Sequence, residues 1–169
     1  VNPTTIDGME QTLLQPAISI EGIIGTGGLV KLGTGAYRPR SPQTYSGLTD
    51  VQAGAVVLGS GVANAGSRFS TYNFALGTQF ELFGTSTVIG GLSGAGAVSN
   101  LSSGAVTLGF GFNNQDTTFS GQFNRASDAF PTTLNVQKYG TGTTVINGAT
   151  TTATGTTGAL TVSGGVLEY

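Results

Sequence analysis

A phrase that ends in Gly-Thr-Gly constrains this chain more than any other feature, because it occurs twice. The copies lie at Gly28–Gly35 and Leu134–Gly142, and each has a lysine two residues before its Gly-Thr-Gly. A Thr-rich stretch and a strand-like closing phrase follow each copy, at Asp50–Leu58 and Leu160–Leu167. A weaker third phrase lies between them, at Val88–Asn100. Such self-similarity predicts a repeat protein with degenerate copies.

Short runs of alternating apolar and polar residues predict β-strands between the glycines. Phe80 and Leu82 alternate with Glu81 and Phe83, and the same period of two recurs along the chain. Gly, Thr and Ser make up roughly two-fifths of the residues and only 8% are charged, against about 25% in an average domain. Many short strands fit all-β folds generally, but repetition of whole phrases favours a solenoid over a sandwich. We expect a parallel β-solenoid with roughly 20–25 residues per coil.

We expect one domain with a lead-in segment at residues 1–21 and a solenoid at residues 22–169. The degenerate repeats cover about residues 22–61, 85–125 and 134–169. Asp7 and Glu10 have the spacing of a capping box, and Ile6, Met9 and Leu13 could form one apolar helical face. A short N-terminal turn or helix that covers the first coil is therefore predicted.

Missing residue types exclude most enzyme chemistry. The chain has no His and no Cys, so it can form no Ser-His-Asp triad, no thiol nucleophile, no disulfide and no zinc or iron–sulfur site based on these ligands. We therefore predict no cofactor and no metal. A net charge of −2 predicts no nucleic-acid partner, and no apolar run is long enough for membrane insertion. Because the sequence begins with Val1 and shows no leader pattern, we expect a processed chain or a fragment of a longer one.

Two stretches carry a resemblance to a known family. Gly25–Gly35 followed by Gln43–Leu58 resembles the autotransporter-associated β-strand repeat of passenger domains. Ile89–Asn100 with Asp116–Gly121 is similar to the spacer that accompanies this repeat, and the whole resemblance covers about residues 22–169. It implies an all-β, right-handed parallel β-helix on a secreted or surface-exposed protein of a bacterium with an outer membrane.

One segment departs from the family pattern. The family usually has a strand after Gly-x-Gly, but Pro39 and Pro42 fall in that position here. Because proline cannot donate to a strand ladder, we expect this face to be bent out or exposed. Arg38 and Arg40 flank Pro39, and they are the candidate contact for a carboxylate or an anionic glycan on a partner. The alternative is a solvated loop whose charges prevent edge pairing.

Other candidate sites have simpler structural interpretations. Arg125 and Asp128 are the nearest approach to the clustered acids and base of a β-helix lyase, but they also fit solvated turn charges. Lys31 and Lys138 suggest isopeptide cross-links or, more simply, repeat consensus. The aromatic residues are expected to stack inward as core, with a sugar-binding platform as the alternative: Phe69, Tyr72, Phe74, Phe80, Phe83, Phe110, Phe112, Phe119 and Phe123.

The C-terminal segment reads as strand up to its last residue. It would form an assembly edge of unpaired backbone groups, with Leu160, Val162, Val166, Leu167 and Tyr169 as its contact residues. We therefore predict a non-enzymatic extracellular or cell-surface structural solenoid, a stalk or a filament subunit that binds itself head to tail. The alternatives are a monomeric adhesin segment that binds a host or matrix glycan and, less favoured, a polysaccharide-active enzyme.

Overall fold

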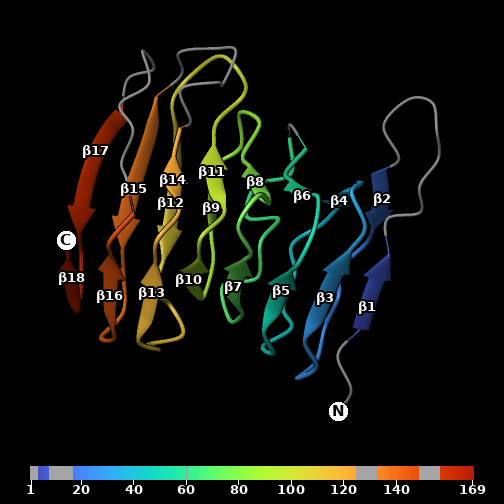
Figure 1. The fold of residues 1–169 in the computed structure, drawn as a ribbon, viewed down its shortest axis with the longest axis horizontal. Helices are drawn as coiled ribbons and strands as arrows, with labels where there is room; N and C mark the ends of the chain where they lie inside the picture. Colours follow the sequence, from blue (N-terminus) through green and yellow to red (C-terminus); the bar gives the residue numbers. More distant parts are fainter. Residues whose placement is uncertain (1–3, 8–16, 60, 125–132, 149–156) are drawn as a thin grey trace.

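The chain folds as a parallel β-solenoid, which confirms the predicted fold class (Figure 1). The computed structural model describes residues 4–7, 17–59, 61–124, 133–148 and 157–169. All strand pairs in these residues are parallel, and the strands form three sheets that run along the long axis of the molecule. Within the described residues, no helix is long and apolar enough to cross a bilayer.

Successive strands along the chain are distributed among the three sheets. The first sheet contains β1 (Thr4–Asp7), β3 (Leu29–Leu32), β5 (Thr49–Val51), β7 (Thr71–Phe74), β10 (Gly91–Gly94), β13 (Thr117–Phe119), β16 (Thr143–Ile146) and β18 (Val166–Glu168). The second contains β2 (Ala17–Ile20), β4 (Ala36–Pro39), β6 (Ala55–Val57), β8 (Gln79–Glu81), β11 (Ala97–Ser99) and β14 (Gln122–Phe123). The third contains β9 (Thr87–Val88), β12 (Val106–Phe110), β15 (Leu134–Lys138) and β17 (Thr157–Val162).

Strand pairing sets the length of each coil. In the first sheet Leu29 pairs with Thr49, 20 residues later, and Thr117 pairs with Thr144, 27 residues later. The other coils of this sheet lie between these values, so all but the longest fall within the predicted range of roughly 20–25 residues. β1 and β2 pair with β3 and β4, so the first two sheets extend into the predicted lead-in segment. Asp7 ends β1, while the rest of the predicted capping helix lies outside the described residues.

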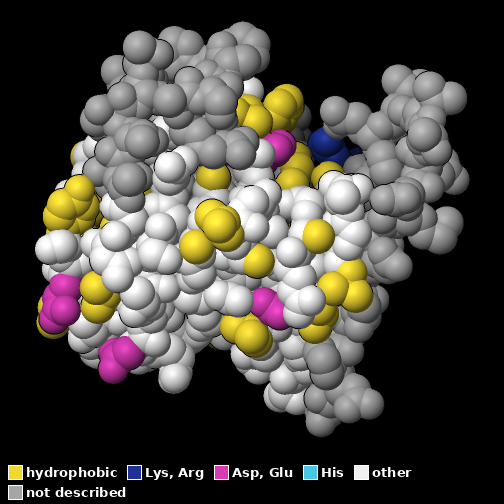
Figure 2. All heavy atoms as spheres, viewed as in Figure 1, with side chains coloured by type: hydrophobic (Ala, Val, Ile, Leu, Met, Phe, Trp, Pro, Cys, Tyr) yellow, Lys and Arg dark blue, Asp and Glu magenta, His cyan; other side chains and the backbone are white. Residues whose placement is uncertain are grey.

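The core consists of inward side chains stacked in columns along the axis. The second sheet aligns Tyr37, Val56, Phe80, Val98 and Phe123 in one such column, and all five are buried. Burial of this kind is the main stabilising term, at about 25 cal/mol per Å² of apolar surface. Outward positions carry mostly uncharged polar groups, so the face seen in Figure 2 has few charged side chains between separate hydrophobic patches.

Aromatic stacking links the first two sheets across the interior. The ring centroids of Phe74 and Phe80 lie 5.2 Å apart, and those of Tyr72 and Phe80 lie 5.7 Å apart, with both pairs nearly parallel. Phe119 and Phe123 repeat the contact at 5.1 Å with tilted rings. These aromatic contacts add stabilisation beyond the buried area. The inward stacking predicted for these aromatic residues is confirmed.

The segment with Pro39 contradicts the expectation of a bent-out face. Ala36–Pro39 is the strand β4, which pairs with β2 on one side and with β6 on the other. Pro39 is buried and lies at the last position of the strand. The next amide, that of Arg40, donates to the carbonyl of Ile20 at 2.9 Å. Proline is tolerated here because the pairing of β4 with β6 ends at Tyr37, before Pro39 is reached.

Both closing phrases turn a corner instead of forming one strand. Asp50–Leu58 is divided between β5 and β6, with Gly54 at a φ of 71° between them. Leu160–Leu167 is likewise divided between β17 and β18, with Gly165 at a φ of 65°. A left-handed backbone at these positions favours glycine, because it has no Cβ. The expectation of strand up to the last residue is therefore wrong.

The two Gly-Thr-Gly phrases lie at different corners of the solenoid. Lys31 is in β3, so its phrase leads from the first sheet to the second. Lys138 ends β15, so its phrase leads from the third sheet to the first. The phrase thus specifies a corner, which consists of a strand with its lysine and the Gly-Thr-Gly turn that follows. This corner is not restricted to one pair of sheets of the solenoid.

Candidate functional site

The outer face of the second sheet carries a groove that includes Arg38. Its volume is about 550 Å³, and the side chains that line it come from three adjacent strands and the loops beyond them: Thr34, Gly35, Ala36, Arg38, Ala55, Val57, Glu81, Phe83 and Leu101. Arg38 is half-buried between its inward neighbours Tyr37 and Pro39. Arg40 is exposed beyond the strand and does not line the groove. The structure therefore separates the two predicted contact residues.

Glu81 and Phe83 give this groove a mixed character that the sequence prediction missed. Phe83 is 42% exposed and has a left-handed φ of 38°, so its ring is not the inward core residue expected. Its alternation with the buried residues Phe80 and Leu82 is the signal that places it outside. Because Glu81 brings a carboxylate to the same groove as Arg38, the groove attracts anions less than the arginine alone would.

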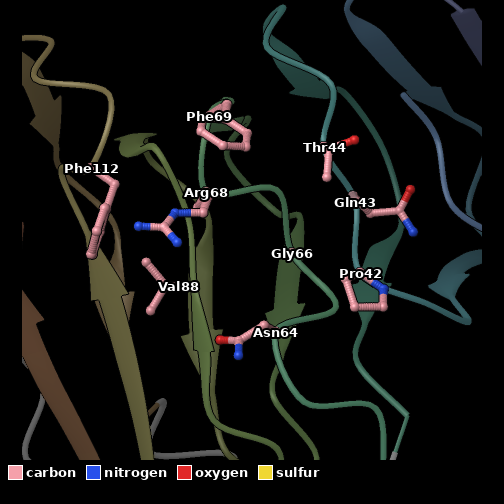
Figure 3. Close-up of a pocket in the computed structure, with 9 residues that line it drawn as sticks. All are labelled: Pro42, Gln43, Thr44, Asn64, Gly66, Arg68, Phe69, Val88 and Phe112. Carbon is pink, nitrogen blue, oxygen red and sulfur yellow. The ribbon is translucent and has the colours of Figure 1, made fainter. Parts of the chain in front are cut away.

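A second hollow, the Arg68 pocket, lies between the loop that precedes β7 and the neighbouring coils (Figure 3). It holds about 310 Å³ and is lined by Pro42, Gln43, Thr44, Asn64, Gly66, Arg68, Phe69, Val88 and Phe112. The Arg68 guanidinium carbon lies 4.5 Å from the ring centroid of Phe112 and 5.8 Å from that of Phe69. Both distances suit cation–π contacts.

Phe69 and Phe112 correct the prediction of inward stacking. Phe69 is 47% exposed, and Phe112 is half-buried on the outside of the coil, where its ring centroid lies 4.7 Å from that of Tyr139. Gly109 leaves room for this arrangement, since a Cβ there would come within 2.8 Å of the Tyr139 ring. The runs of aromatic residues in the sequence thus contain both core and surface positions.

A buried polar network lies directly inside the loop that carries Arg68. The Thr49 hydroxyl is 2.6 Å from the Tyr45 hydroxyl and 2.7 Å from that of Ser70. The Ser67 amide donates to the Tyr72 hydroxyl at 2.9 Å, and the Ser67 hydroxyl donates to the Tyr45 carbonyl at 2.6 Å. Because a satisfied polar network in the interior is rigid, it fixes the backbone on which Arg68 and Phe69 stand.

Burial perturbs the tyrosines of this network. Desolvation, reinforced by the neighbouring Tyr72, raises the pKa of Tyr45 well above its ordinary value. Desolvation also raises the pKa of Tyr72, against the lowering effect of the hydrogen bonds it receives. Both phenols are neutral at physiological pH, so they act as hydrogen-bonding groups that hold neighbouring coils together.

Lys31 and Lys138 have structural positions at the corners. Both side chains are 0% exposed. The Lys31 ammonium donates to the carbonyls of Leu32 and Gly33, the latter at 2.8 Å, and to that of Ala53 in the next coil at 3.2 Å. Lys138 donates to the carbonyls of Tyr139 and, at 3.5 Å, of Gly164 in the next coil. Their role is to satisfy corner carbonyls, as expected of repeat consensus residues.

Burial lowers the pKa of Lys138, while the nearby Asp116 carboxylate acts in the opposite direction. No group of three or more metal-ligating side chains is found in the described residues. Arg125 and Asp128, the candidate lyase-like pair, lie outside them. The buried ammonium groups of Lys31 and Lys138 both contact corner carbonyls.

The predicted assembly edge is exposed in this chain. β17 and β18 are the outermost strands of the third and first sheets. Leu160 is 56% exposed, Val162 and Val166 are about half exposed, and Tyr169 is mostly exposed. Leu167 is half-buried and packs against the core. The five residues thus lie on two strands of different sheets, joined by a turn.

Comparison with known proteins agrees with the family resemblance. Over 148 residues, or 86% of this chain, the sequence is 34% identical to a protein named adhesin BmaC autotransporter from Brucella suis biovar 1 (strain 1330). The chain spans only 4% of the length of that relative. No family model and no solved structure gives a significant match. The parallel solenoid, its repeated corner phrases and this similarity together fit an autotransporter passenger with β-strand repeats.

Proposed function

We propose that this chain is a segment of a surface-exposed, non-enzymatic adhesin, in which the solenoid serves as a rigid support for binding surfaces. The observation that carries the proposal is the uninterrupted stacking of the first sheet from β1 to β18. Such a ladder makes a stiff rod whose outer faces are free to vary, because each coil contacts only its neighbours. The 34% identity to an adhesin autotransporter supports both the adhesive role and the location at the cell surface.

The location is tested on intact bacteria that produce the natural full-length protein with an epitope tag inserted at the exposed Leu76. Antibody should bind intact cells, and external protease should remove the signal while a periplasmic protein remains protected. Signal that appears only after lysis would contradict the proposal. Adhesion is tested separately with beads coated with the purified chain, which should attach to host cells or extracellular matrix more strongly than beads coated with albumin.

Arg38 is proposed as one partner contact on this support. The groove around it offers a cation, the Glu81 carboxylate and the exposed Phe83 ring, a combination that suits a partner with both charges and an apolar group. Arg40 lies outside the groove and should contribute less. Substitution Arg38→Ala should therefore reduce bead attachment more than Arg40→Ala. Equal effects of both substitutions would contradict this assignment.

End-to-end assembly is a second candidate, in which Leu160 and Val162 of β17 would form the contact. A further coil of another copy that packs on this edge would bury Leu160 and Val162 and pair the strand. The purified chain should then associate with increasing concentration in analytical ultracentrifugation. Leu160→Lys should abolish the association, whereas Thr161→Lys on the same exposed strand should have little effect. A monomer at all concentrations would refute assembly and leave the adhesin proposal intact.

A further inference from the structure

Arg68 is the last member of a stack of three side chains, in which the other two, Phe112 and Tyr139, come from later coils. Tyr139 contacts Phe112, and Phe112 supports one face of the Arg68 guanidinium at 4.5 Å. No hydrogen bond or ion pair occupies the N–H groups of Arg68 within the described residues. A planar guanidinium that is stacked on an aromatic ring and free at its edge is preorganised for a bidentate contact with a carboxylate.

The rest of the Arg68 pocket offers groups that match a sugar ring. Phe69 presents a half-exposed aromatic face, and Pro42 and Val88 add apolar surface (Figure 3). Thr44 and Asn64 are exposed at the same rim and can hydrogen-bond hydroxyl groups. A volume of about 310 Å³ lies at the lower end of the range of small-ligand pockets and suits one monosaccharide unit.

The floor of the pocket is kept open and rigid by the chain itself. A Cβ on Gly66 would come within 2.8 Å of the Ile89 side chain, so no larger residue fits there without displacement. The following residue, Ser67, is hydrogen-bonded through its amide and its hydroxyl to the buried tyrosines. Because the loop is already ordered, a ligand would bind without a large loss of conformational entropy.

We propose that the Arg68 pocket binds a pyranose unit that carries a carboxylate, as part of an acidic glycan. The guanidinium of Arg68 pairs with the carboxylate, Phe69 packs against the C–H face of the ring, and Asn64 and Thr44 contact hydroxyl groups. An aromatic face favours this ligand over an acidic peptide, whose carboxylates are borne on flexible chains without a rigid apolar face. The inference rests on the proposed adhesin function and names the ligand class of one of its surfaces.

The test is isothermal titration of the purified chain with five probes: trigalacturonate, its methyl ester, 3′-sialyllactose, lactose and a hexaglutamate peptide. We expect binding of trigalacturonate or sialyllactose, with at least about 10-fold weaker binding of the matching uncharged probe. Arg68→Gln should weaken binding about 10-fold or more, and Phe69→Ala about 5-fold. Arg40→Gln is the matched control, because it removes the same charge from an exposed position that lines neither this pocket nor the Arg38 groove, and it should leave binding within about 2-fold.

Several results would overturn the proposal. These are equal affinity for the charged and uncharged sugars, binding unchanged by Arg68→Gln, no binding of any probe, and Arg68-dependent binding of hexaglutamate that equals that of the sugars. Arg68 and Phe69 are exposed, so circular dichroism should show folded variants. Bead attachment and surface display do not depend on these probes, so a failed titration would refute this ligand class while the adhesin proposal stands.

Discussion

The buried ammonium of Lys31 should be essential for the stability of its corner. Lys31→Met keeps the length and apolar stem of the side chain but removes the donor to three carbonyls, those of Leu32, Gly33 and Ala53. A buried acceptor left without a partner costs about 1–3 kcal/mol. Removing the charge also removes its desolvation cost, which offsets part of that loss. We expect a net loss of about 2–5 kcal/mol, a large part of the 5–15 kcal/mol that stabilises a typical domain.

The corresponding change at Lys138 should cost less. Its ammonium donates to two carbonyls, and the hydrogen bond to Gly164 is 3.5 Å long, at the limit of a hydrogen bond. Lys138→Met should therefore destabilise the chain by about 1–3 kcal/mol. Urea unfolding followed by far-ultraviolet circular dichroism measures both variants.

Arg38→Met serves as the control for this pair, because it removes a cation that has no hydrogen-bond or ion-pair partner in the described residues. Its effect should stay within about 0.5 kcal/mol. The reasoning would be refuted if Lys31→Met were as stable as the parent chain, or more stable. That outcome would mean that the desolvation cost of the ammonium outweighs its contacts with the carbonyls.

Three further predictions concern the interior. Folding raises the pKa values of Tyr45 and Tyr72, so their contribution to the free energy of unfolding is complete below pH 10. Above pH 10 this contribution is lost at up to about 1.4 kcal/mol per pH unit for each tyrosine. Urea unfolding midpoints measured between pH 9 and pH 12 check this, and a midpoint that does not change with pH would contradict it. Thr49→Val should cost about 1–3 kcal/mol because it breaks two buried hydrogen bonds, whereas Thr49→Ser should cost clearly less. Gly121→Ala should prevent normal stacking of the coils, because its Cβ would lie 1.8 Å from a carbonyl oxygen of the preceding coil. A Cβ at Gly59 meets nothing within 4 Å, so Gly59→Ala should leave the melting temperature unchanged in thermal melts.

The sequence predicted the solenoid because its information is local. Because side chains alternate between the two faces of a strand, Phe80 and Leu82 point into the core and Glu81 points outward, whichever coil contains them. Glycine positions likewise predict corners. The mistaken interpretation of Ala36–Pro39 had a local origin as well, because a proline at the last residue of a strand looks in sequence like a proline that interrupts one.

The binding surfaces could not be predicted in the same way, because they depend on contacts between coils. Arg68 and Phe112 are far apart in sequence and belong to different coils, yet their side chains stack. Nothing in either segment indicates which side of the solenoid it occupies, and the two copies of the Gly-Thr-Gly phrase lie at different corners. Glu81 joins Arg38 for the same reason, through the stacking of β4, β6 and β8.

The corner lysines also give the stack a direction. Lys31 donates to Ala53 and Lys138 donates to Gly164, so each ammonium reaches toward the coil that follows it in the chain. Removal of the following coil takes one carbonyl acceptor away from a buried ammonium group, whereas removal of the preceding coil leaves the hydrogen bonds to Ala53 and Gly164 intact. Under tension the two faces of such a coil should therefore yield at different forces, and the solenoid should behave as a polar rod whose resistance to fraying depends on the end that is pulled.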